Sequence, residues 1–596
     1  MVGLFQENGP CQVVEIAEGQ IGTQAREWGW DRSSNVIYID QPNMVGFSYD
    51  VLTNASLDLL TSALDYPPSS VPSGQSAYSF LNGTFSSNNS SATANTTAIA
   101  AHAIWHMLQG FLGAFPQYNP GSSPNSTQPG VVGINLFAES YGGKYGPAFG
   151  AFWEQQNLLR STGFIPRNKT LEIRLTSLGI MQGCVDDLVQ GPSYPIFAYN
   201  NTYGIQAISL VDQQTAANSF LSADGCQQKI VACRNAANLS DPQNEGDVAT
   251  VDDICKSAQL NCNNNVIGPY QASGRNVYDI RQLNPDPFPP SVYLEYLNSA
   301  VVQAAIGTPV NYTEANAAVS NAFLQTGDDD RGGHIEDMAY LLALGVRVAL
   351  IYGDSDYLCN WLGGEAVSFS VAAKSPSHSP FYSAGYAAIV VNDTYVGGAV
   401  RQFGNLSFSR IYDAGHLIPA YQPETAFTVF TRVIMGTDLS TGKAVNLTSF
   451  GTTGSANATH TNSAPPQNSP TCWVRNVGNT CTNDQKLMIH NNEGVIINGV
   501  LYDEANDWKA PAPSVVVQAG MPGTVPSAMT ATTAAASKSS VSSAATTTSN
   551  ALTGVYVATG TPSTSKKGAA CRARSFSKLE AIVTLALTFV VSMVGD

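Results

Sequence analysis

Charged residues are scarce in this sequence. Of its 596 residues, only 12% are Asp, Glu, Lys or Arg, whereas 43% are hydrophobic and 9% aromatic. Disorder throughout the chain requires the opposite balance and is therefore excluded. The length allows one large domain or two to three ordinary ones. The 28 basic residues are outnumbered by 44 acidic ones, and a net charge of −16 argues against nucleic-acid binding because phosphates are repelled.

The usual zinc patterns are also missing. The ten cysteines form no C-x-x-C pair, and no glutamate follows His102 to complete H-E-x-x-H with His106. We therefore expect helix packing for the two histidines, disulfides for the cysteines, and no metal or other cofactor. Four cysteines cluster in an Asn-rich stretch, where a nested pairing of Cys226 with Cys262 and Cys233 with Cys255 is favoured, although spacing does not fix connectivity. Cys472 and Cys481 lie close together.

A signal peptide is missing too, since Met1 leads into MVGLFQENGP with no basic start and no sustained apolar run. Yet N-x-S/T acceptors are frequent and, with the cysteines, indicate a secreted glycoprotein. They are Asn54, Asn82, Asn88, Asn89, Asn95, Asn125, Asn168, Asn200, Asn238, Asn311, Asn392, Asn405, Asn446 and Asn457. The sequence thus predicts a secretory-pathway protein, extracellular or at the cell surface, whose oligomeric state it does not indicate.

Apolar runs and helical periods alternate along the first part of the chain. Buried strands are predicted at 35–40, 131–138, 174–183 and 346–354, and helices at 97–116 and from about 147. Strands that alternate with helices predict an α/β fold with a mostly parallel sheet. Between 186 and 335 strands no longer alternate with helices, which indicates an inserted helical, disulfide-rich cap. The core is accordingly divided into 1–185 and 336–440.

The composition changes after residue 440. An extension at 441–520 is followed by 521–567, which holds twenty Ser/Thr and three charged residues and predicts an extended, O-glycosylated stalk. The end, 568–596, has small residues at Gly568-Ala569-Ala570, a polar spacer and an apolar tail at 581–594. This pattern is typical of a GPI-attachment signal, so membrane contact is expected only through a lipid anchor. A conventional span and an unstructured tail are the alternatives.

The first indication of catalytic chemistry is a strand that runs into a tight turn, in the segment LFAESYGGKYGP. Ala138-Glu139-Ser140-Tyr141-Gly142 fits the G-x-S-x-G nucleophile elbow, with alanine in place of the first glycine. Such a turn exposes the Ser140 hydroxyl and directs the Tyr141 N–H at an oxyanion. The alternative interpretation is an ordinary glycine-rich turn between a strand and a helix.

Two later segments add an acid and a base. Asp354 and Asp356 follow a buried strand in LIYGDSDYLCNWLGG, and His416 lies in the loop RIYDAGHLIPAYQP. Separately, such residues are more often helix caps or packed side chains. Together, they give the chain order Ser, Asp, His of the α/β-hydrolases. The residues alone leave the choice between Asp354 and Asp356 open.

Several motifs resemble those of the serine carboxypeptidases. ESYGGKYGP, GDSDYLCNWLGG and DAGHLIPAYQPE are similar to the three active-site motifs of that family. Further matches are ENGPC at 7–11, NVIYIDQPNMVGFSY at 35–49, FPQY after the first helix, and NVYDIR at 276–281. The resemblance runs from residue 1 to about 440 and implies an α/β-hydrolase fold and release of C-terminal amino acids from peptides through an acyl-enzyme.

The resemblance also implies roles for individual residues. Ser140 is expected to be the nucleophile, His416 the general base and Asp356 the acid that orients it. The family recognises the free carboxylate of its substrate with an asparagine and two glutamic acids, and the latter correspond to Glu7 and Glu139. Two carboxyls at one site share a proton, so activity at acid pH is expected.

A pocket for the departing residue follows from the same resemblance. Val2, Gln6, Cys359 and Leu417 correspond to the family's pocket residues, and Cys359 is expected there as an unpaired thiol. The alternatives are an inert buried cysteine or a disulfide with Cys11 or Cys184.

One family motif is missing from this sequence. The G-G-P-G segment that normally precedes LFQENGP, and that supplies the second oxyanion N–H, does not occur. The sequence therefore predicts that the chain as written is N-terminally truncated, lacks opening strands and is inactive when expressed alone. The alternative functions are a relative without peptidase activity, such as an acyltransferase, and an inactive surface glycoprotein that acts by binding.

Overall fold

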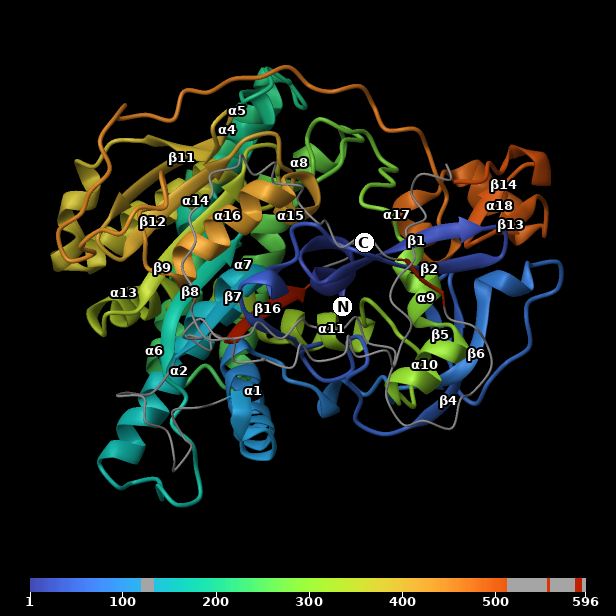
Figure 1. Ribbon diagram of the computed structural model, residues 1–596, viewed down its shortest axis with the longest axis horizontal. Coiled ribbons are helices and arrows are strands. Elements are labelled where there is room, and N and C mark those ends of the chain that lie inside the picture. The colour runs from blue at the N-terminus through green and yellow to red at the C-terminus, as the bar shows by residue number, and fades with distance from the viewer. Residues whose placement is uncertain (119–132, 512–554, 558–584, 592–596) are drawn as a thin grey trace, which may run out of the picture.

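A computed structural model of the chain describes residues 1–118 and 133–511, with the short strands 555–557 and 585–591. In Figure 1 a large sheet flanked by helices occupies one side of the molecule, and a group of smaller strands and helices occupies the other. The sheet and its helices build the α/β core, and the residues of chemical interest lie at the ends of its strands.

The central sheet has eight strands in the order β10-β11-β12-β9-β8-β7-β16-β3. From β12 to β3 all neighbours are parallel, while β10, β11 and β12 pair antiparallel. The strands are β3 (Asn35–Tyr38), β7 (Ile134–Ser140), β8 (Leu175–Met181), β9 (Arg347–Gly353), β10 (Ala387–Asn392), β11 (Tyr395–Phe403), β12 (Leu406–Ile411) and β16 (Leu585–Val591). The predicted mostly parallel α/β sheet is confirmed.

Successive side chains of the inner strands enter two separate apolar clusters. Leu136 and Leu350 join the first cluster, whereas Phe137 and Ile351 join the second, as the two-residue period of a strand requires. The first cluster packs against α1 (Thr97–Ala114), α2 (Gly142–Ser161), α13 (His334–Ala343) and α14 (Trp361–Lys374). The second packs against α16 (Pro423–Ile434) and the 3-10 turn η2 (Trp30–Arg32). The sheet is thus covered on both faces.

The second helix begins earlier than its sequence pattern predicts. It was expected from about 147, but α2 begins at Gly142, directly after the serine turn. Glycines are poor helix formers, and here the tertiary structure outweighs that preference. A Cβ at Gly143 would lie 2.7 Å from the carbonyl oxygen of Cys184, and one at Gly146 would lie 2.8 Å from Ile180. The first turns of α2 therefore pack on the sheet at a distance that only glycine allows.

The insertion at 186–335 is helical. Its helices are α3 (Asp187–Gln190), α4 (Ser193–Tyr199), α5 (Leu210–Leu221), α6 (Cys226–Ser240), α7 (Ala249–Cys262), α8 (Gly268–Gln271), α9 (Val292–Leu297), α10 (Ala300–Ile306), α11 (Ala317–Thr326) and α12 (Asp328–Arg331). Disulfides join Cys226 to Cys262 and Cys233 to Cys255, which confirms the nested pairing. The domain boundaries themselves remain predictions.

Smaller elements surround the N-terminal segment. The short π-helix η1 (Gly3–Glu7) leads into β1 (Cys11–Ala17) and β2 (Gln20–Ala25), and β15 (Val555–Val557) pairs with β2. The other small elements are β4 (Thr53–Asp58), β5 (Ala63–Asp65), β6 (Phe80–Phe85), α15 (Ile418–Tyr421), α17 (Val477–Thr480), α18 (Asn483–His490), β13 (Val495–Ile497) and β14 (Val500–Tyr502). A disulfide joins Cys472 to Cys481 beside α17.

The predicted stalk and GPI signal lie mostly outside the described residues. Within the stalk only β15 is described, and within the signal only β16, which pairs with β3 on one side and with β7 on the other. Its residues belong to the apolar tail at 581–594. In the described part of the chain, no helix combines the length and the apolarity that a membrane crossing requires.

The second apolar cluster gives a test of the fold. Phe430 is fully buried, stacks on Trp30 at 4.0 Å between ring centroids, and meets Phe137 of β7 edge-on at 5.0 Å. We expect Phe430→Ala to lower the free energy of unfolding by about 3–5 kcal/mol, because it removes apolar contact and leaves a cavity. Phe164 is 80% exposed, so Phe164→Ala should change it by less than about 0.5 kcal/mol. Denaturant unfolding followed by circular dichroism measures both, and equal losses would contradict this assignment.

Candidate active site

Ser140 ends β7 in an unusual backbone conformation. Its φ is +60°, in the left-handed region that residues other than glycine seldom adopt. Tyr141 follows as the N-cap of α2, so its N–H belongs to the helix-start donors that have no partner within the helix. The serine is therefore presented at a sharp turn between a buried strand and a helix, as a nucleophile elbow requires.

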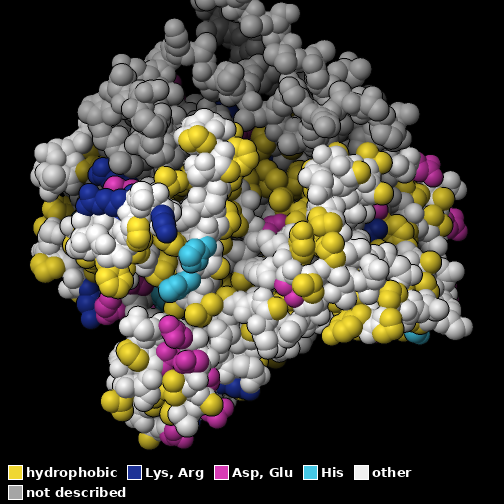
Figure 2. Space-filling view, turned by 90° about the horizontal axis from the view of Figure 1, so that it is seen from below, with side chains coloured by type: hydrophobic (Ala, Val, Ile, Leu, Met, Phe, Trp, Pro, Cys, Tyr) yellow, Lys and Arg dark blue, Asp and Glu magenta, His cyan; other side chains and the backbone are white. Residues whose placement is uncertain are grey.

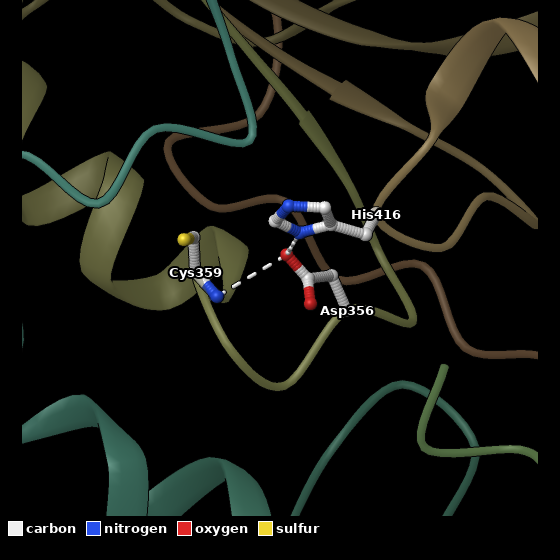
Figure 3. Close-up of side chains that lie close together, drawn as sticks. All are labelled: Asp356, Cys359 and His416. Carbon is white, nitrogen blue, oxygen red and sulfur yellow. Dashed lines mark hydrogen bonds and ion pairs between the residues drawn. The ribbon is translucent and has the colours of Figure 1, made fainter. Parts of the chain in front are cut away.

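His416 and Asp356 form a buried pair. His416 Nδ1 lies 2.8 Å from Asp356 Oδ2, and both side chains are almost fully inaccessible (Figure 3). The N–H groups of Leu358 and Cys359 donate to the same carboxylate at 2.9 and 3.2 Å. Burial raises the pKa of Asp356, while the charge of His416 and these hydrogen bonds partly counteract that rise. The bond at Nδ1 leaves Nε2 of His416 as the nitrogen that can accept a proton from a nucleophile.

The histidine loop is held by backbone contacts. The N–H of His416 donates to the carbonyl of Tyr278 at 2.9 Å, and the Tyr278 ring lies 5.0 Å from the imidazole.

Within the described residues, the Ser140 hydroxyl has no hydrogen-bond partner. Catalytic hydrogen bonds are often long in a free enzyme and tighten when substrate binds.

Asp354 has different partners. It accepts a hydrogen bond from the Tyr203 hydroxyl at 2.6 Å and lies 3.6 Å from Nη2 of Arg410. Burial raises the pKa of Asp354 to about 6, although Tyr203 and Arg410 favour its charged form. Of the two aspartates that the sequence left open, Asp356 is therefore the one bonded to His416, and Asp354 belongs to a neighbouring polar cluster.

The donor set at this site does not suit a metal ion. Asp356, Cys359 and His416 offer ligand atoms within 4.8 Å of one another, and this is the one such group among the described residues. However, the Cys359 sulfur is bound in a disulfide and cannot act as a thiolate. The other two atoms are hydrogen-bonded to each other. The arrangement is suited to moving a proton.

Glu7 and Glu139 lie together near this pair. Both side chains are fully buried, and each carboxyl acts on the pKa of the other, so the two are close. No described group is hydrogen-bonded to the oxygens of either carboxyl. Burial raises the pKa of Glu7, and burial together with the charge of Glu7 raises the pKa of Glu139 well above its usual range. The charge of His416 lowers the pKa of Glu7, and the charge of Asp356 raises the pKa of Glu139. The glutamate pair therefore lies close to the pair of His416 and Asp356.

The predicted pocket residues lie in different surroundings. Val2 is buried in an apolar cluster against which Leu417, directly after His416, also packs. Gln6 donates its amide to the carbonyls of Pro289 and Pro290 in the insertion, at 3.2 Å each. The structure brings Val2 and Leu417 together beside the histidine and ties Gln6 to the insertion.

Cys359 differs from its prediction. It was expected to be an unpaired thiol, but it forms a disulfide with Cys184, which was one of the two partners left open. The physical reason is topological. Cys184 follows β8 and Cys359 follows β9, and these strands are parallel neighbours, so the two loops emerge side by side.

Three polar contacts near the site have no signal in the sequence. Gln182, at the end of β8, donates to the carbonyl of Gly415 at 3.0 Å and so braces the histidine loop. The Tyr141 hydroxyl donates to Asp328 of the insertion at 2.5 Å. Lys144, 1% exposed, lies 3.8 Å from Asp329. Only the three-dimensional structure brings Gln182, Asp328 and Asp329 to these partners.

His102 and His106 lie on the surface of α1. The His102 ring lies 4.3 Å from Phe152 and the His106 ring 5.0 Å from Trp105. Burial lowers the pKa of His102, against the opposing charge of Glu245. Figure 2 shows one face of the molecule, with histidine side chains at the surface and acidic side chains nearby. No third ligand joins them in the described part of the chain.

Comparison with known proteins gives consistent matches. The family model described as "Serine carboxypeptidase" matches residues 1–436. Carboxypeptidase S1 homolog B of Arthroderma otae is 41% identical over 84% of this chain and 76% of its own. Carboxypeptidase S1 homolog A of Trichophyton rubrum is 39% identical over 89% of this chain and 80% of its own.

A solved structure shares the fold. Kex1(delta)p, described as a prohormone-processing carboxypeptidase from Saccharomyces cerevisiae, matches with a TM-score of 0.50 and 17% identity. The match covers 74% of this chain and 80% of that one. The predicted α/β-hydrolase fold with a helical, disulfide-rich insertion is confirmed.

The two aspartates give a test of the site. Asp356→Asn keeps the side-chain shape but removes the charge bonded to His416, and we expect acylation of Ser140 by a fluorophosphonate to slow by about 10⁴-fold, as when a triad acid is lost. Asp354→Asn is the matched control and should slow it by less than about tenfold, since its partners are Tyr203 and Arg410. The rate at which Ser140 is labelled can be measured by mass spectrometry for both variants. A larger loss of rate in Asp354→Asn than in Asp356→Asn would contradict the assignment.

Proposed function

Because the chain belongs to the serine carboxypeptidase family, we propose that Ser140, His416 and Asp356 are the catalytic triad of its peptidase activity. The protein is a serine-type peptidase, and its substrates are peptides. The observation that carries the assignment is the hydrogen bond from His416 Nδ1 to Asp356, at the strand edge where Ser140 turns away from the sheet. This geometry leaves Nε2 to act as base towards the serine.

The proposed reaction has two halves. His416 Nε2 removes the proton of Ser140 as Oγ attacks the carbonyl carbon of the last peptide bond. The Tyr141 N–H stabilises the resulting oxyanion. The imidazolium then passes its proton to the departing amino group, so the C-terminal amino acid leaves and an acyl-enzyme remains. A water molecule, deprotonated by His416, hydrolyses that ester and restores the serine.

The Glu7–Glu139 pair is proposed to recognise the free C-terminus. A substrate carboxylate needs hydrogen-bond donors, and an ionised glutamate offers none. The protonated partner of a pair that shares one proton can donate. Because the pKa values of both residues are raised, this protonated form is favoured over a wider pH range than it would be for a solvated glutamate. Val2, Leu417, Gln6 and the disulfide at Cys359 are proposed to surround the departing side chain.

This recognition makes peptide hydrolysis pH-dependent. Below the raised pKa the pair holds its proton and binds the carboxylate; as pH rises through that pKa the donor is lost. We expect hydrolysis of a blocked dipeptide, measured as released amino acid, to be best in acid and to fall towards neutral pH through a rising KM. An ester of the same acyl group has no carboxylate to recognise and should persist to higher pH, with Ser140→Ala as the blank for both assays.

Glu7→Gln sharpens the same test. Its amide donates at every pH, so the rise of peptide KM should move to higher pH while ester hydrolysis stays within about threefold of wild type. Glu18 is exposed in the β1–β2 turn, and Glu18→Gln is the control that should leave both profiles unchanged. Coincident peptide and ester profiles in the wild type would contradict carboxylate recognition by this pair.

We further propose that the chain passes through the secretory pathway and is anchored at the cell surface by a GPI group attached at Gly568. Its relatives are fungal carboxypeptidases, and many sequon asparagines are exposed: Asn54, Asn82, Asn89, Asn168, Asn200, Asn238, Asn392, Asn446 and Asn457. Attachment at Gly568 would remove the segment that contains β16 and leave the position between β3 and β7 without that strand.

The anchor can be tested directly. A phosphatidylinositol-specific phospholipase should release the protein from washed cell membranes, and the C-terminal peptide of the released protein should end at Gly568. Gly568→Trp should prevent attachment because GPI attachment requires small residues, whereas Gly554→Trp, within the stalk, should not. Retention after phospholipase treatment, or a released protein that still contains Leu585–Val591, would overturn this proposal.

A further inference from the structure

One disulfide lies directly between the two halves of the proposed triad. Cys184 and Cys359 are separated by 175 positions, and their Cα atoms are 5.1 Å apart. Cys184 lies just after β8 and Cys359 in the loop after β9. Because these strands are parallel neighbours, both loops leave the sheet at the edge where Ser140, Asp356 and His416 meet.

The Cys184 side contacts the nucleophile turn. Its N–H donates to the carbonyl oxygen of Ser140 at 3.0 Å. Its backbone also packs against Gly143 in the first turn of α2, where a Cβ would lie within 2.9 Å of three Cys184 backbone atoms. Cys184 therefore supports the serine turn at its carbonyl and at the start of the following helix, the point from which the Tyr141 N–H is presented.

The Cys359 side contacts the acid. Its N–H donates at 3.2 Å to Oδ2 of Asp356, the same oxygen that lies 2.8 Å from His416 Nδ1. Figure 3 shows this arrangement, with the Cys359 nitrogen directed at the carboxylate and its sulfur on the side away from it. The loop from Asp356 to Cys359 thus wraps around its own carboxylate, and the sulfur closes the loop onto Cys184.

We propose that the Cys184–Cys359 disulfide is a positioning element for catalysis, which fixes the distance between the Ser140 turn and the Asp356 loop. The role rests on the triad assigned under "Proposed function". A covalent link of fixed length constrains the two loops more tightly than the backbone hydrogen bonds do by themselves. Misplacing catalytic groups by about 1 Å costs roughly 10²-fold in rate, so the constraint acts on the rate of the chemical step.

The double variant Cys184→Ala/Cys359→Ala tests the proposal. The substrate should be a methyl ester, because methanol makes little contact with the pocket beside Cys359. We expect kcat to fall by about 10- to 100-fold with KM within about threefold. We also expect the acid limb of kcat/KM against pH to move to lower pH, because a relaxed Asp356 supports the imidazolium of His416 less well. Cys472→Ala/Cys481→Ala removes another disulfide, which lies beside α17 in a different apolar cluster from Tyr141 and Tyr357, and should leave kcat and the acid limb unchanged.

A purely structural role would give a different pattern. If both double variants lose thermal stability while kcat and the acid limb stay at wild-type values, the positioning role is overturned. If the Cys184/Cys359 variant fails to fold, the proposal can be tested on the native enzyme. Cys184 is partly exposed, so tris(2-carboxyethyl)phosphine can reduce the disulfide and iodoacetamide can then alkylate the two cysteines. Molecules alkylated at both cysteines should react with a fluorophosphonate at least about tenfold more slowly than untreated enzyme, and equal rates would overturn the proposal.

The same reagents separate this proposal from the triad assignment. Wild-type enzyme that a fluorophosphonate does not label at Ser140 would contradict the triad itself. Wild-type enzyme labelled at Ser140, together with an unaffected double variant, would contradict only the role of the disulfide.

Discussion

Parallel pairing of β7, β8, β9 and β12 is the constraint on which the candidate site depends. In this register Glu139 lies opposite Met181, Met181 opposite Ile351, and Ile411 opposite Gly353. Parallel strands end at one edge of a sheet, so the segments that follow them emerge together although they are far apart in the sequence. The proposed nucleophile, acid and base, and both cysteines of the Cys184–Cys359 disulfide, come from these segments. Shifting one strand by one residue would turn its side chains to the other face.

The three buried acids of the site differ in the hydrogen-bond donors that reach them. Asp356 receives two backbone N–H groups and faces His416, whereas no described group donates to the oxygens of Glu7 and Glu139. All three side chains are fully buried, so burial raises the pKa of each. His416 and two backbone N–H groups counteract the rise for Asp356, Glu139 and the charge of His416 counteract it for Glu7, and for Glu139 the charge of Glu7 adds to it. Different surroundings can thus separate the pKa values of neighbouring acids, as the roles proposed for Asp356 and the glutamate pair require.

Local patterns in the sequence were sufficient for β3, β7, β8 and β9, for the turn at Ser140 and for the nested cysteines, because each depends on neighbours in the chain or on short spacings. They did not identify β10, β11, β12 or β16 of the same sheet. They could not choose between Asp354 and Asp356, since that choice depends on Tyr203 and Arg410, which are remote in sequence. The partner of Cys359 was open for the same reason. The sequence did not predict the early start of α2, because glycines are poor helix formers. Only the structure shows that these glycines allow Cys184 and the sheet to approach the helix closely.

The insertion interrupts the strand pattern, yet it supports the start of α2, the helix that follows Ser140. Asp328 accepts from the hydroxyl of Tyr141, the residue whose N–H is proposed to face the oxyanion, and from both the N–H and the hydroxyl of Thr97 at the start of α1. One residue further, Asp329 lies against Lys144 in the first turn of α2, and burial raises the pKa of Asp329 to about 7. Buried polar groups of this kind are costly unless they are paired, and removal of one partner leaves the other unsatisfied. A change in α12 would therefore act on the serine turn through Tyr141 and Lys144, so the insertion and the core form one unit at Ser140.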